Sequence, residues 1–465
     1  MAEKAIENSE RNPENDTSKV ANKVIADKPK VLLIRPKYWS LVANLEPFGL
    51  EYLVGLCNDL GIESEILDEF QYSWNFRYSR MKKLIKKGGY NFIGFNANAN
   101  TVDYILGRAK QLKKDFNHLT IMVGGPEAEL NYKDFCTDDV DIVYYDNGLV
   151  TLKNMFVDGL SVENLNKQTG ICFKVDGEWV FKEKGAPVNG FITKPDRTAF
   201  YKGFKKNYIF MKGKFALSKG SFSCPFNCNF CYCTKMNSGV YTERAMEEII
   251  EDIESINHDK IWFVDDTFFC SRERVTQFCE AVKARGIKKQ FMAYSRADFL
   301  AENPDILPMA YEAGFRDIMV GLEAVSDEQL DEYNKQTSRD ENILAIKHLH
   351  DANICCNALF VVSHTSTKED FRNLYKFCKD NNLLWVVFGI FTPYKGTDAY
   401  EQYKDRLVNF TSKRRDGLHI TIKPEHMSSF MFMFRYYWLH VLTYPRVVTR
   451  AIAGTAYDTK KTGWF

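Results

Sequence analysis

The sequence predicts an α/β protein with a doubly wound amino-terminal domain, a partial (β/α)6 barrel and an α-rich carboxyl-terminal extension. Two series of apolar segments, over residues 30–147 and 209–393, alternate with amphipathic segments. Apolar strands separated by helices are typical of parallel sheets that helices cover. The aromatic stretch 430–444, beyond the last predicted strand, indicates a further helix. We expect a tail over 1–28, the doubly wound domain over 29–160, a hairpin and linker over 161–208, the barrel over 209–400 and the extension over 401–465.

The composition favours a cytoplasmic enzyme. Lysine and arginine number 62 against 61 acidic residues, a net charge of +1, so no overall field attracts nucleic acid. Most of the 12 cysteines lie inside apolar segments, as reduced core thiols do, which argues against a disulfide framework. Residues 1–28 are polar, lack the apolar core of a signal peptide and are expected to be disordered. No uncharged apolar run has transmembrane length.

The doubly wound domain is predicted from apolar strands at 30–36, 64–69, 91–98, 119–126 and 141–147, with helices that include 46–60 and 101–116. Ligands of such sheets bind beyond the carboxyl ends of the strands. Amide or glycine residues stand at those ends: Asn96, Asn98, Gly124, Gly125 and Gly148. The sequence then alternates around Asp176-Gly177, which predicts a hairpin over 171–182. We expect this hairpin to pack as an appendage between the domains.

The barrel is predicted from six strands, at 209–218, 261–266, 291–298, 317–325, 354–364 and 383–393. Six strand–helix units are too few to close an eight-unit barrel, so we expect an open, partial one. Catalytic groups of barrels lie at the carboxyl ends of the strands. Charged residues stand at three of these ends: Asp265 and Asp266, Arg296, and Glu323.

Three cysteines follow the first barrel strand with the spacing C-x3-C-x2-C: Cys224, Cys228 and Cys231. Cysteine thiolates are the usual ligands of iron–sulfur clusters, and four saturate a cubane cluster. Three ligands leave one iron open to a substrate. The alternatives are a zinc site, which normally takes four ligands, and chance. Cys233 lies two residues further on and is interpreted as a packing thiol.

The cysteine spacing closely resembles the signature of the radical S-adenosylmethionine (SAM) superfamily. The flanking segments resemble its cobalamin-binding-domain-containing (class B methyltransferase-like) group, over about residues 30–400. Motifs similar to that group's are PFGLEYL at 47–53, VGGP at 123–126, FVDDTF at 263–268, GLE at 321–323 and TPYKGT at 392–397. One departure is Asp146-Asn147-Gly148-Leu149, where the group has G-E-G-E.

The resemblance implies a [4Fe–4S] cluster on the three cysteines, with SAM at its open iron. It assigns SAM contacts to residues of the cysteine loop and the strand ends: Phe230, Asp265, Asp266, Arg296, Glu323, Pro393 and Gly396. For the two aspartates another interpretation stays open. Either can be a carboxylate at a helix N-terminus, opposite Arg272 or Arg274.

The resemblance also implies cobalamin beyond the front sheet, in contact with Asn96, Asn98, Gly124, Gly125 and Gly148. A histidine that coordinates cobalt has to lie at this edge of the sheet. Residues 29–185 contain one histidine, His118, which precedes its strand and so lies at the opposite edge. We therefore expect no protein imidazole from this domain on the cobalt. The alternative is a domain that keeps the fold without the cofactor.

The resemblance implies a cobalamin-dependent radical SAM enzyme that methylates an unactivated carbon through a 5′-deoxyadenosyl radical and methylcobalamin. No residue is assigned as catalytic. The alternatives are cyclisation, oxidation or rearrangement with a vestigial front domain, and a cobalamin- or SAM-responsive binding protein. The expected partners are a small-molecule, lipid or peptide substrate and an electron donor such as flavodoxin or ferredoxin. We interpret 430–444 as a buried capping helix, with a lid over an apolar substrate or a peripheral membrane contact as alternatives.

Overall fold

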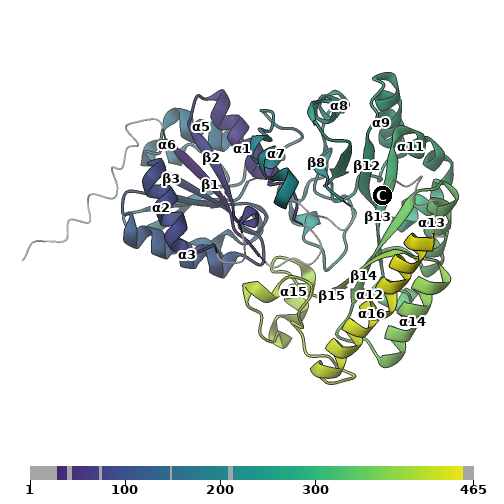
Figure 1. Cartoon of the computed structure of the whole chain (residues 1–465). Coiled ribbons are helices and arrows are strands. Elements are labelled where there is room, and N and C mark those ends of the chain that lie inside the picture. Colours follow the sequence, from purple (N-terminus) through teal and green to yellow (C-terminus); the bar gives the residue numbers. More distant parts are fainter. Residues whose placement is uncertain (1–28, 39–43, 73–75, 147–148, 208–212, 454–465) are drawn as a thin grey trace, which may run out of the picture.

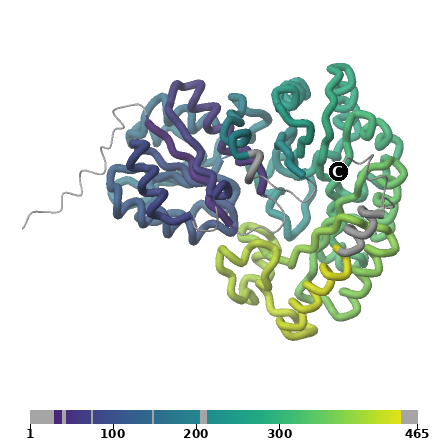
Figure 2. The backbone as a smooth tube through the Cα atoms, viewed as in Figure 1, coloured from purple at the N-terminus to yellow at the C-terminus, as the bar shows by residue number. Residues whose placement is uncertain are grey.

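The computed structural model describes residues 29–38, 44–72, 76–146, 149–207 and 213–453. They form an amino-terminal lobe, a second lobe built on a barrel-like sheet, and an extension that contacts both (Figures 1 and 2). The predicted tail, 1–28, lies outside the described residues. The linker between the lobes carries one helix, α7 (Thr198–Asn207).

The amino-terminal lobe contains a seven-stranded sheet in the order β2-β1-β3-β4-β5-β6-β7. Its strands are β1 (Val31–Arg35), β2 (Ser64–Asp68), β3 (Phe92–Asn96), β4 (Thr120–Gly124), β5 (Ile142–Tyr144), β6 (Ile171–Val175) and β7 (Glu178–Phe181). Its helices are α1 (Phe48–Asp59), α2 (Tyr78–Gly88), α3 (Val102–Asp115), α4 (Pro126–Asn131), α5 (Val150–Asp158) and α6 (Val162–Asn166). The five strands predicted from the sequence all form, and they pair in parallel.

Alternate residues of these strands enter two separate hydrophobic clusters. On β1, Val31 and Leu33 pack with apolar residues of α1 and α5, whereas Leu32 and Ile34 pack with those of α2 and α3. Successive side chains of a strand point to opposite faces, so the sheet is covered on both sides. The lobe is therefore doubly wound, as the sequence predicts.

The expectation that the 171–182 hairpin is a separate appendage is wrong. β6 pairs antiparallel with β5, Ile142 opposite Phe173, and β7 pairs with β6. Ile171, Cys172 and Phe173 are buried, so the apolar half of the hairpin gains more by extending the sheet than by standing apart.

The second lobe contains a six-stranded parallel sheet in the order β15-β14-β13-β12-β11-β8. Its strands are β8 (Ala216–Ser218), β11 (Lys260–Phe263), β12 (Gln290–Arg296), β13 (Phe315–Glu323), β14 (Cys355–Val362) and β15 (Trp385–Ile390). Within the described residues β8 and β15 are not paired, so the sheet is an open, partial barrel, as predicted. A small antiparallel ribbon, β9 (Ser221–Phe222) with β10 (Thr242–Glu243), was not predicted.

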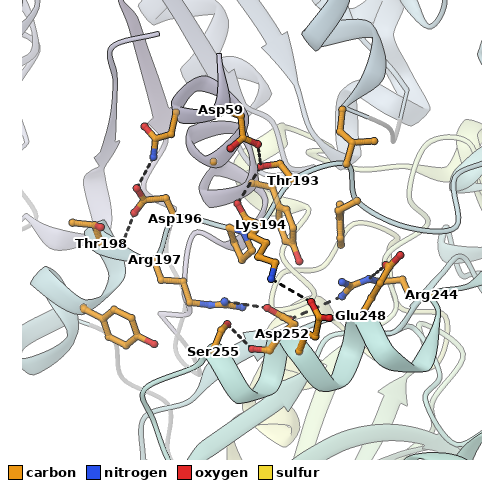
Figure 3. Close-up of a pocket in the computed structure, with 18 residues that line it drawn as sticks. Asp59, Thr193, Lys194, Asp196, Arg197, Thr198, Arg244, Glu248, Asp252 and Ser255 are labelled. Carbon is orange, nitrogen blue, oxygen red and sulfur yellow. Dashed lines mark hydrogen bonds and ion pairs between the residues drawn. The ribbon is translucent and has the colours of Figure 1, made fainter. Parts of the chain in front are cut away.

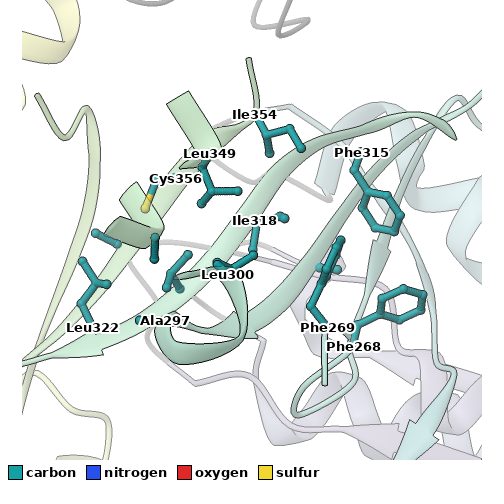
Figure 4. Close-up of a cluster of buried hydrophobic side chains, with 14 of the residues drawn as sticks. Phe268, Phe269, Ala297, Leu300, Phe315, Ile318, Leu322, Leu349, Ile354 and Cys356 are labelled. Atoms are coloured by element: carbon teal, nitrogen blue, oxygen red, sulfur yellow. The ribbon is translucent and has the colours of Figure 1, made fainter. Parts of the chain in front are cut away.

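Helices cover the outside of this sheet. They are α8 (Met246–Ser255), α9 (Arg272–Ala284), α10 (Ala297–Glu302), α11 (Leu307–Ala313), α12 (Asp327–Glu332), α13 (Arg339–Asp351) and α14 (Lys368–Asp380). Figure 4 shows the core between sheet and helices, where Phe315 and Ile318 of β13 pack with Leu300 of α10 and Leu349 of α13. The strands thus rest on a rigid apolar layer and present their carboxyl ends at one rim.

The extension contains α15 (Asp398–Tyr403), a 3-10 turn η8 (Ser412–Arg414) and the long helix α16 (Ser429–Ala453). α16 lies beside α14 (Figure 1) and buries Phe432, Tyr436 and Leu439 in the core of the second lobe. The Tyr436 hydroxyl donates to the Phe388 carbonyl of β15 at 2.7 Å. The expectation of a buried capping helix is therefore correct for one face of α16 only, because the opposite face, which carries Phe430, Phe434, Tyr437, Trp438 and Val441, is exposed. None of the described helices is both long and apolar enough to span a membrane.

Candidate active site

The cysteine loop begins directly after β9 and is held by two elements distant in sequence. The Asn229 amide donates to the Tyr333 carbonyl at 3.2 Å, beyond the end of α12. The Asn334 side chain donates to the Asn227 carbonyl at 2.7 Å. On the other side, the Ala399 amide of α15 donates to the Asn229 carbonyl at 3.0 Å. These bonds fix a loop with no regular structure of its own at the rim of the barrel.

Two cations lie beside Cys228. The Arg296 guanidinium, at the end of β12, stands 4.0 Å from the centre of the Phe226 ring, and its Nη1 is 3.9 Å from Cys228 Sγ. Burial raises the pKa of Cys228, and the charges of Lys335 and Arg296 oppose that rise. Arg296, predicted as a SAM contact, thus lies beside the cysteine loop, where its guanidinium also pairs with Asp298 at 2.7 Å. Its contact with SAM stays a prediction.

The cysteines also lie near one another. Burial raises the pKa of Cys224 to about 12, and the charges of Cys231, Asp266 and Cys228 add to the rise. Cys231 contacts Cys233, which the sequence did not reveal. A hydrogen bond from the Cys233 thiol lowers the pKa of Cys231. Among the described residues, no three His, Cys, Asp or Glu side chains are grouped closely enough to hold a single metal ion.

The two aspartates after β11 have different surroundings. The Asp265 carboxylate is buried and accepts from the Gly220 amide at 2.8 Å and the Ser221 hydroxyl at 2.6 Å. Burial raises the pKa of Asp265, and the nearby charge of Arg274 opposes the rise. Asp265 therefore fixes the turn ahead of the cysteines. This role is structural but differs from the helix N-terminus left open above, because Ser271 caps α9, and Arg272 and Arg274 pair with Asp305 and Glu243. Asp266 faces the cysteine loop instead, where it hydrogen bonds to Cys233.

Glu323, at the end of β13, forms a buried ion pair with Lys335 at 3.0 Å. Its φ of +59° and the register shift between Gly321 and Glu323 mark a β-bulge that turns the carboxylate out of the strand. A Cβ on Gly321 would lie 2.4 Å from Glu323 Oε1 and 2.9 Å from Lys335 Nζ, so any larger residue there would have to displace this pair. Sequence reasoning missed Lys335, which stands in a connecting loop without a motif or a periodic pattern.

The remaining predicted SAM contacts are Phe230, within the cysteine loop, and Pro393 and Gly396, in the turn after β15. Phe230 packs edge-on against Tyr333, with ring centroids 5.4 Å apart. The turn that contains Pro393 and Gly396 reaches the amino-terminal lobe, since Lys395 pairs with Asp134 at 2.7 Å. Phe230 thus faces a small apolar cluster that includes Tyr333 and Phe391, whereas the turn contacts the front lobe.

At the carboxyl edge of the front sheet, the Asn98 side-chain amide donates to Asn96 Oδ1 at 3.4 Å. Gly125 has a φ of +104°, and a Cβ there would lie 2.9 Å from the backbone of Ala97. The fold itself therefore requires a glycine at this position, whether or not a ligand approaches it. Gly124 has only ordinary contacts around its Cβ position. Gly148 lies outside the described residues.

This edge also has polar atoms with nothing to bind. Asn100 Oδ1 and the Tyr144 hydroxyl are buried without a hydrogen-bond partner among the described residues. Buried polar atoms normally have partners, so these two suit a ligand with donors and acceptors. His118 is exposed in the turn ahead of β4, at the opposite edge, as expected.

The short helix α4, which starts just after Gly125, joins this edge to the cysteine side. Glu129 accepts from the Asn237 amide, six residues beyond Cys231, at 2.7 Å. Glu127 pairs with Arg415 of the extension at 2.8 Å, and both side chains are buried. The carboxyl edge of the front sheet and the cysteine loop are therefore fixed on the same side of the interface between the lobes.

A second set of ion pairs joins the lobes near the linker. Arg197 contacts Glu46 at 2.9 Å and Asp252 of α8 at 3.1 Å, and it donates to the Leu217 carbonyl at 2.9 Å. Arg197 and Asp252 border a cavity of about 830 Å³ between α1, the linker and α8 (Figure 3). Arg197 belongs to the linker sequence Pro195-Asp196-Arg197 and acts as an anchor between the lobes.

Comparison with known proteins finds a family match within the second lobe and similar folds over most of the chain. Residues 219–378 match the model of the Radical SAM superfamily. The anaerobic magnesium-protoporphyrin IX monomethyl ester cyclase of Rubrivivax gelatinosus is 23% identical over 414 residues, which are 86% of this chain and 74% of that protein.

Two solved structures share the fold over most of this chain. The radical SAM methyltransferase TsrM from Kitasatospora setae, solved with cobalamin and a [4Fe–4S] cluster, has a TM-score of 0.64 at 15% identity, over 82% of this chain and 78% of that chain. The cobalamin-dependent radical SAM enzyme OxsB, solved with aqua-cobalamin, has a TM-score of 0.63 at 17% identity over 81% of this chain. The match spans only 55% of OxsB.

Proposed function

Because residues 219–378 of this chain form a radical SAM domain, we propose that the protein is a cobalamin-dependent radical SAM enzyme that methylates an unactivated carbon. The main support is the interface at α4. There the carboxyl edge of the front sheet and the cysteine loop are held on one side, by Glu129 with Asn237 and by Glu127 with Arg415. A methyl carrier and a radical source have to face one substrate, which this arrangement permits.

In this proposal Cys224, Cys228 and Cys231 hold a [4Fe–4S] cluster. The donor set fits, because three half-buried thiols share one loop and two cations stand beside it. When bound, such a cluster supplies the electron that cleaves SAM, and cobalamin supplies a methyl carrier. Arg296 offsets thiolate charge at Cys228.

The SAM contacts we propose are those whose side chains or backbone border the cysteine loop: Asp266, Glu323, Phe230, Pro393 and Gly396. Asp266 is placed to accept the methionyl ammonium, because it faces the loop. We assign Asp265 a positioning role only, since both its oxygens already accept bonds from the turn at Gly220.

Cobalamin is proposed to lie over the carboxyl edge of the front sheet, at Asn96, Asn98, Gly124 and Gly125, with Gly148 beyond the described residues. The unpartnered Asn100 Oδ1 and Tyr144 hydroxyl support a ligand there. Since the lobe's single histidine, His118, is at the far edge, no imidazole of this lobe coordinates the cobalt.

A second candidate, ring closure, is favoured by the cyclase relative. Product analysis separates the two. Methyl transfer from SAM leaves S-adenosylhomocysteine, and radical cleavage leaves 5′-deoxyadenosine. Methylation through cobalamin therefore yields both products, whereas radical ring closure yields deoxyadenosine alone.

The test is anaerobic incubation of the reconstituted protein with reductant, cobalamin and SAM carrying a deuterated methyl group, in fractionated lipid, peptide and small-molecule extracts. We expect both S-adenosylhomocysteine and 5′-deoxyadenosine, and a product in which one deuterated methyl group has replaced a hydrogen of the substrate. Deoxyadenosine without S-adenosylhomocysteine in every fraction contradicts methylation and favours the cyclase alternative.

A further inference from the structure

Helix α16 presents large apolar side chains to solvent as well as to the core. Its exposed face carries five of them, each 50% to 79% exposed: Phe430, Phe434, Tyr437, Trp438 and Val441. Their spacing of four, three, one and three residues places all five on one side of the helix, opposite the buried Phe432, Tyr436 and Leu439. We call these five residues the aromatic stripe. A contiguous exposed apolar patch marks an interaction surface.

The stripe is ordered along the helix. The rings of Phe434 and Trp438 are parallel, with centroids 6.2 Å apart. The opposite face of α16 holds the helix on the second lobe. There Tyr436 donates to the Phe388 carbonyl, and Phe432 packs edge-on against Phe371. The stripe is therefore presented by a rigid helix on the outside of the second lobe.

The charged residues of α16 itself are all cations. The 25 residues of α16 include no aspartate or glutamate, and Arg435 lies within it. Lys413 of η8 borders a cavity of about 530 Å³ together with Tyr437 and Tyr444. Lys413 and the neighbouring Arg414 are exposed and form no ion pair with a described residue. The one acidic residue at this cavity, Asp416, is hydrogen bonded to His419 at 2.9 Å.

We propose that the aromatic stripe docks on the surface of an anionic phospholipid bilayer, with Lys413 and Arg414 at the headgroups. Aromatic rings favour the boundary between headgroups and acyl chains, and unpaired cations beside them are attracted to anionic lipid. A second copy of the chain fits less well. A two-fold contact through this face brings α16 against α16, where no carboxylate is available for the cations.

The test uses the full-length protein and phosphatidylcholine vesicles, with or without phosphatidylglycerol, in a flotation assay. We expect the protein to float with the anionic vesicles. The triple change Phe430→Ser, Phe434→Ser and Trp438→Ser should lower the bound fraction at least about tenfold, because the removed rings carry most of the apolar area. These side chains are exposed, so the thermal unfolding of the variant should match that of the parent.

A matched control changes three exposed apolar residues elsewhere, Val157→Ser, Phe181→Ser and Leu344→Ser, and should float like the parent. Lys413→Glu with Arg414→Glu should reduce binding to the anionic vesicles and make the remainder insensitive to salt. The proposal is overturned if the parent protein fails to float, or if the stripe variant floats as well as the control. A concentration-dependent dimer that the stripe variant loses, without vesicle binding, overturns it in favour of self-association. The proposed chemistry is unaffected by these outcomes.

Discussion

Arg415→Met tests how the lobes are joined beside the proposed cofactors. Arg415 Nη1 lies 2.8 Å from Glu127 Oε1, and the two side chains are only 6% and 5% exposed. The change leaves the Glu127 carboxylate buried without its cation. Removing one partner of a buried pair typically costs about 3–5 kcal/mol. The free energy of unfolding should fall by that amount near neutral pH.

The pH dependence gives a second check. Burial raises the pKa of Glu127, and Arg415 opposes the rise. A carboxyl whose pKa is higher in the folded than in the unfolded state loses stability as pH rises through the interval between the two values. Without Arg415 the folded pKa rises further, so the loss of stability should be smaller at about pH 5 than at about pH 8.

The assay is denaturant unfolding of the variant, followed by tryptophan fluorescence at both pH values. Lys404→Met serves as the control, because Lys404 pairs with Glu401 at the same 2.8 Å but on the surface. The double variant Glu127→Gln, Arg415→Met should recover much of the stability, since no charge is left buried. An Arg415→Met effect at about pH 8 that is no larger than that of Lys404→Met, or one that is larger at about pH 5 than at about pH 8, refutes the reasoning.

Three further predictions concern the two proposed sites. Lys335→Met should lower the reduction potential of the reconstituted cluster, because it removes a positive charge near Cys228, and Lys335→Arg should restore it in a redox titration. Gly125→Ala should destabilise the front lobe by about 1–3 kcal/mol more than Gly124→Ala in thermal unfolding. Only Gly125 has a positive φ, and only there would a Cβ press against the backbone of Ala97. Cys233→Ala should leave the iron content per chain unchanged, since Cys233 lies outside the three-cysteine spacing, and loss of iron contradicts this.

The sequence predicts the strands and their parallel pairing well, because long apolar runs carry a strong periodic signal. It fails at the hairpin, 171–182, where alternation predicts two strands but does not say which sheet edge they join. That choice depends on the burial of Cys172 and Phe173 against β5, a contact distant in sequence.

The candidate site was predicted in part. Arg296 was expected on the cluster side of the barrel as a SAM contact because it ends a strand. Its guanidinium lies 3.9 Å from Cys228 Sγ, and the SAM contact stays a prediction. Asp265 and Asp266 could not be separated, since only the fold decides that one carboxylate holds the turn and the other faces the cysteine loop. Lys335 and the Glu127–Arg415 pair come from loops and long-range contacts, for which a single sequence gives no signal.

The proposed function requires a cluster on Cys224, Cys228 and Cys231, and one measurement tests for it directly. The variant Cys224→Ala, Cys228→Ala, Cys231→Ala is reconstituted anaerobically with iron and sulfide, and its iron content and the EPR spectrum of the reduced protein are compared with those of the parent. Cys270→Ala, a half-buried cysteine outside the spacing, is the control. We predict a [4Fe–4S] signal in the parent and in the control and none in the triple variant. A full cluster in the triple variant, or none in the parent, contradicts the account.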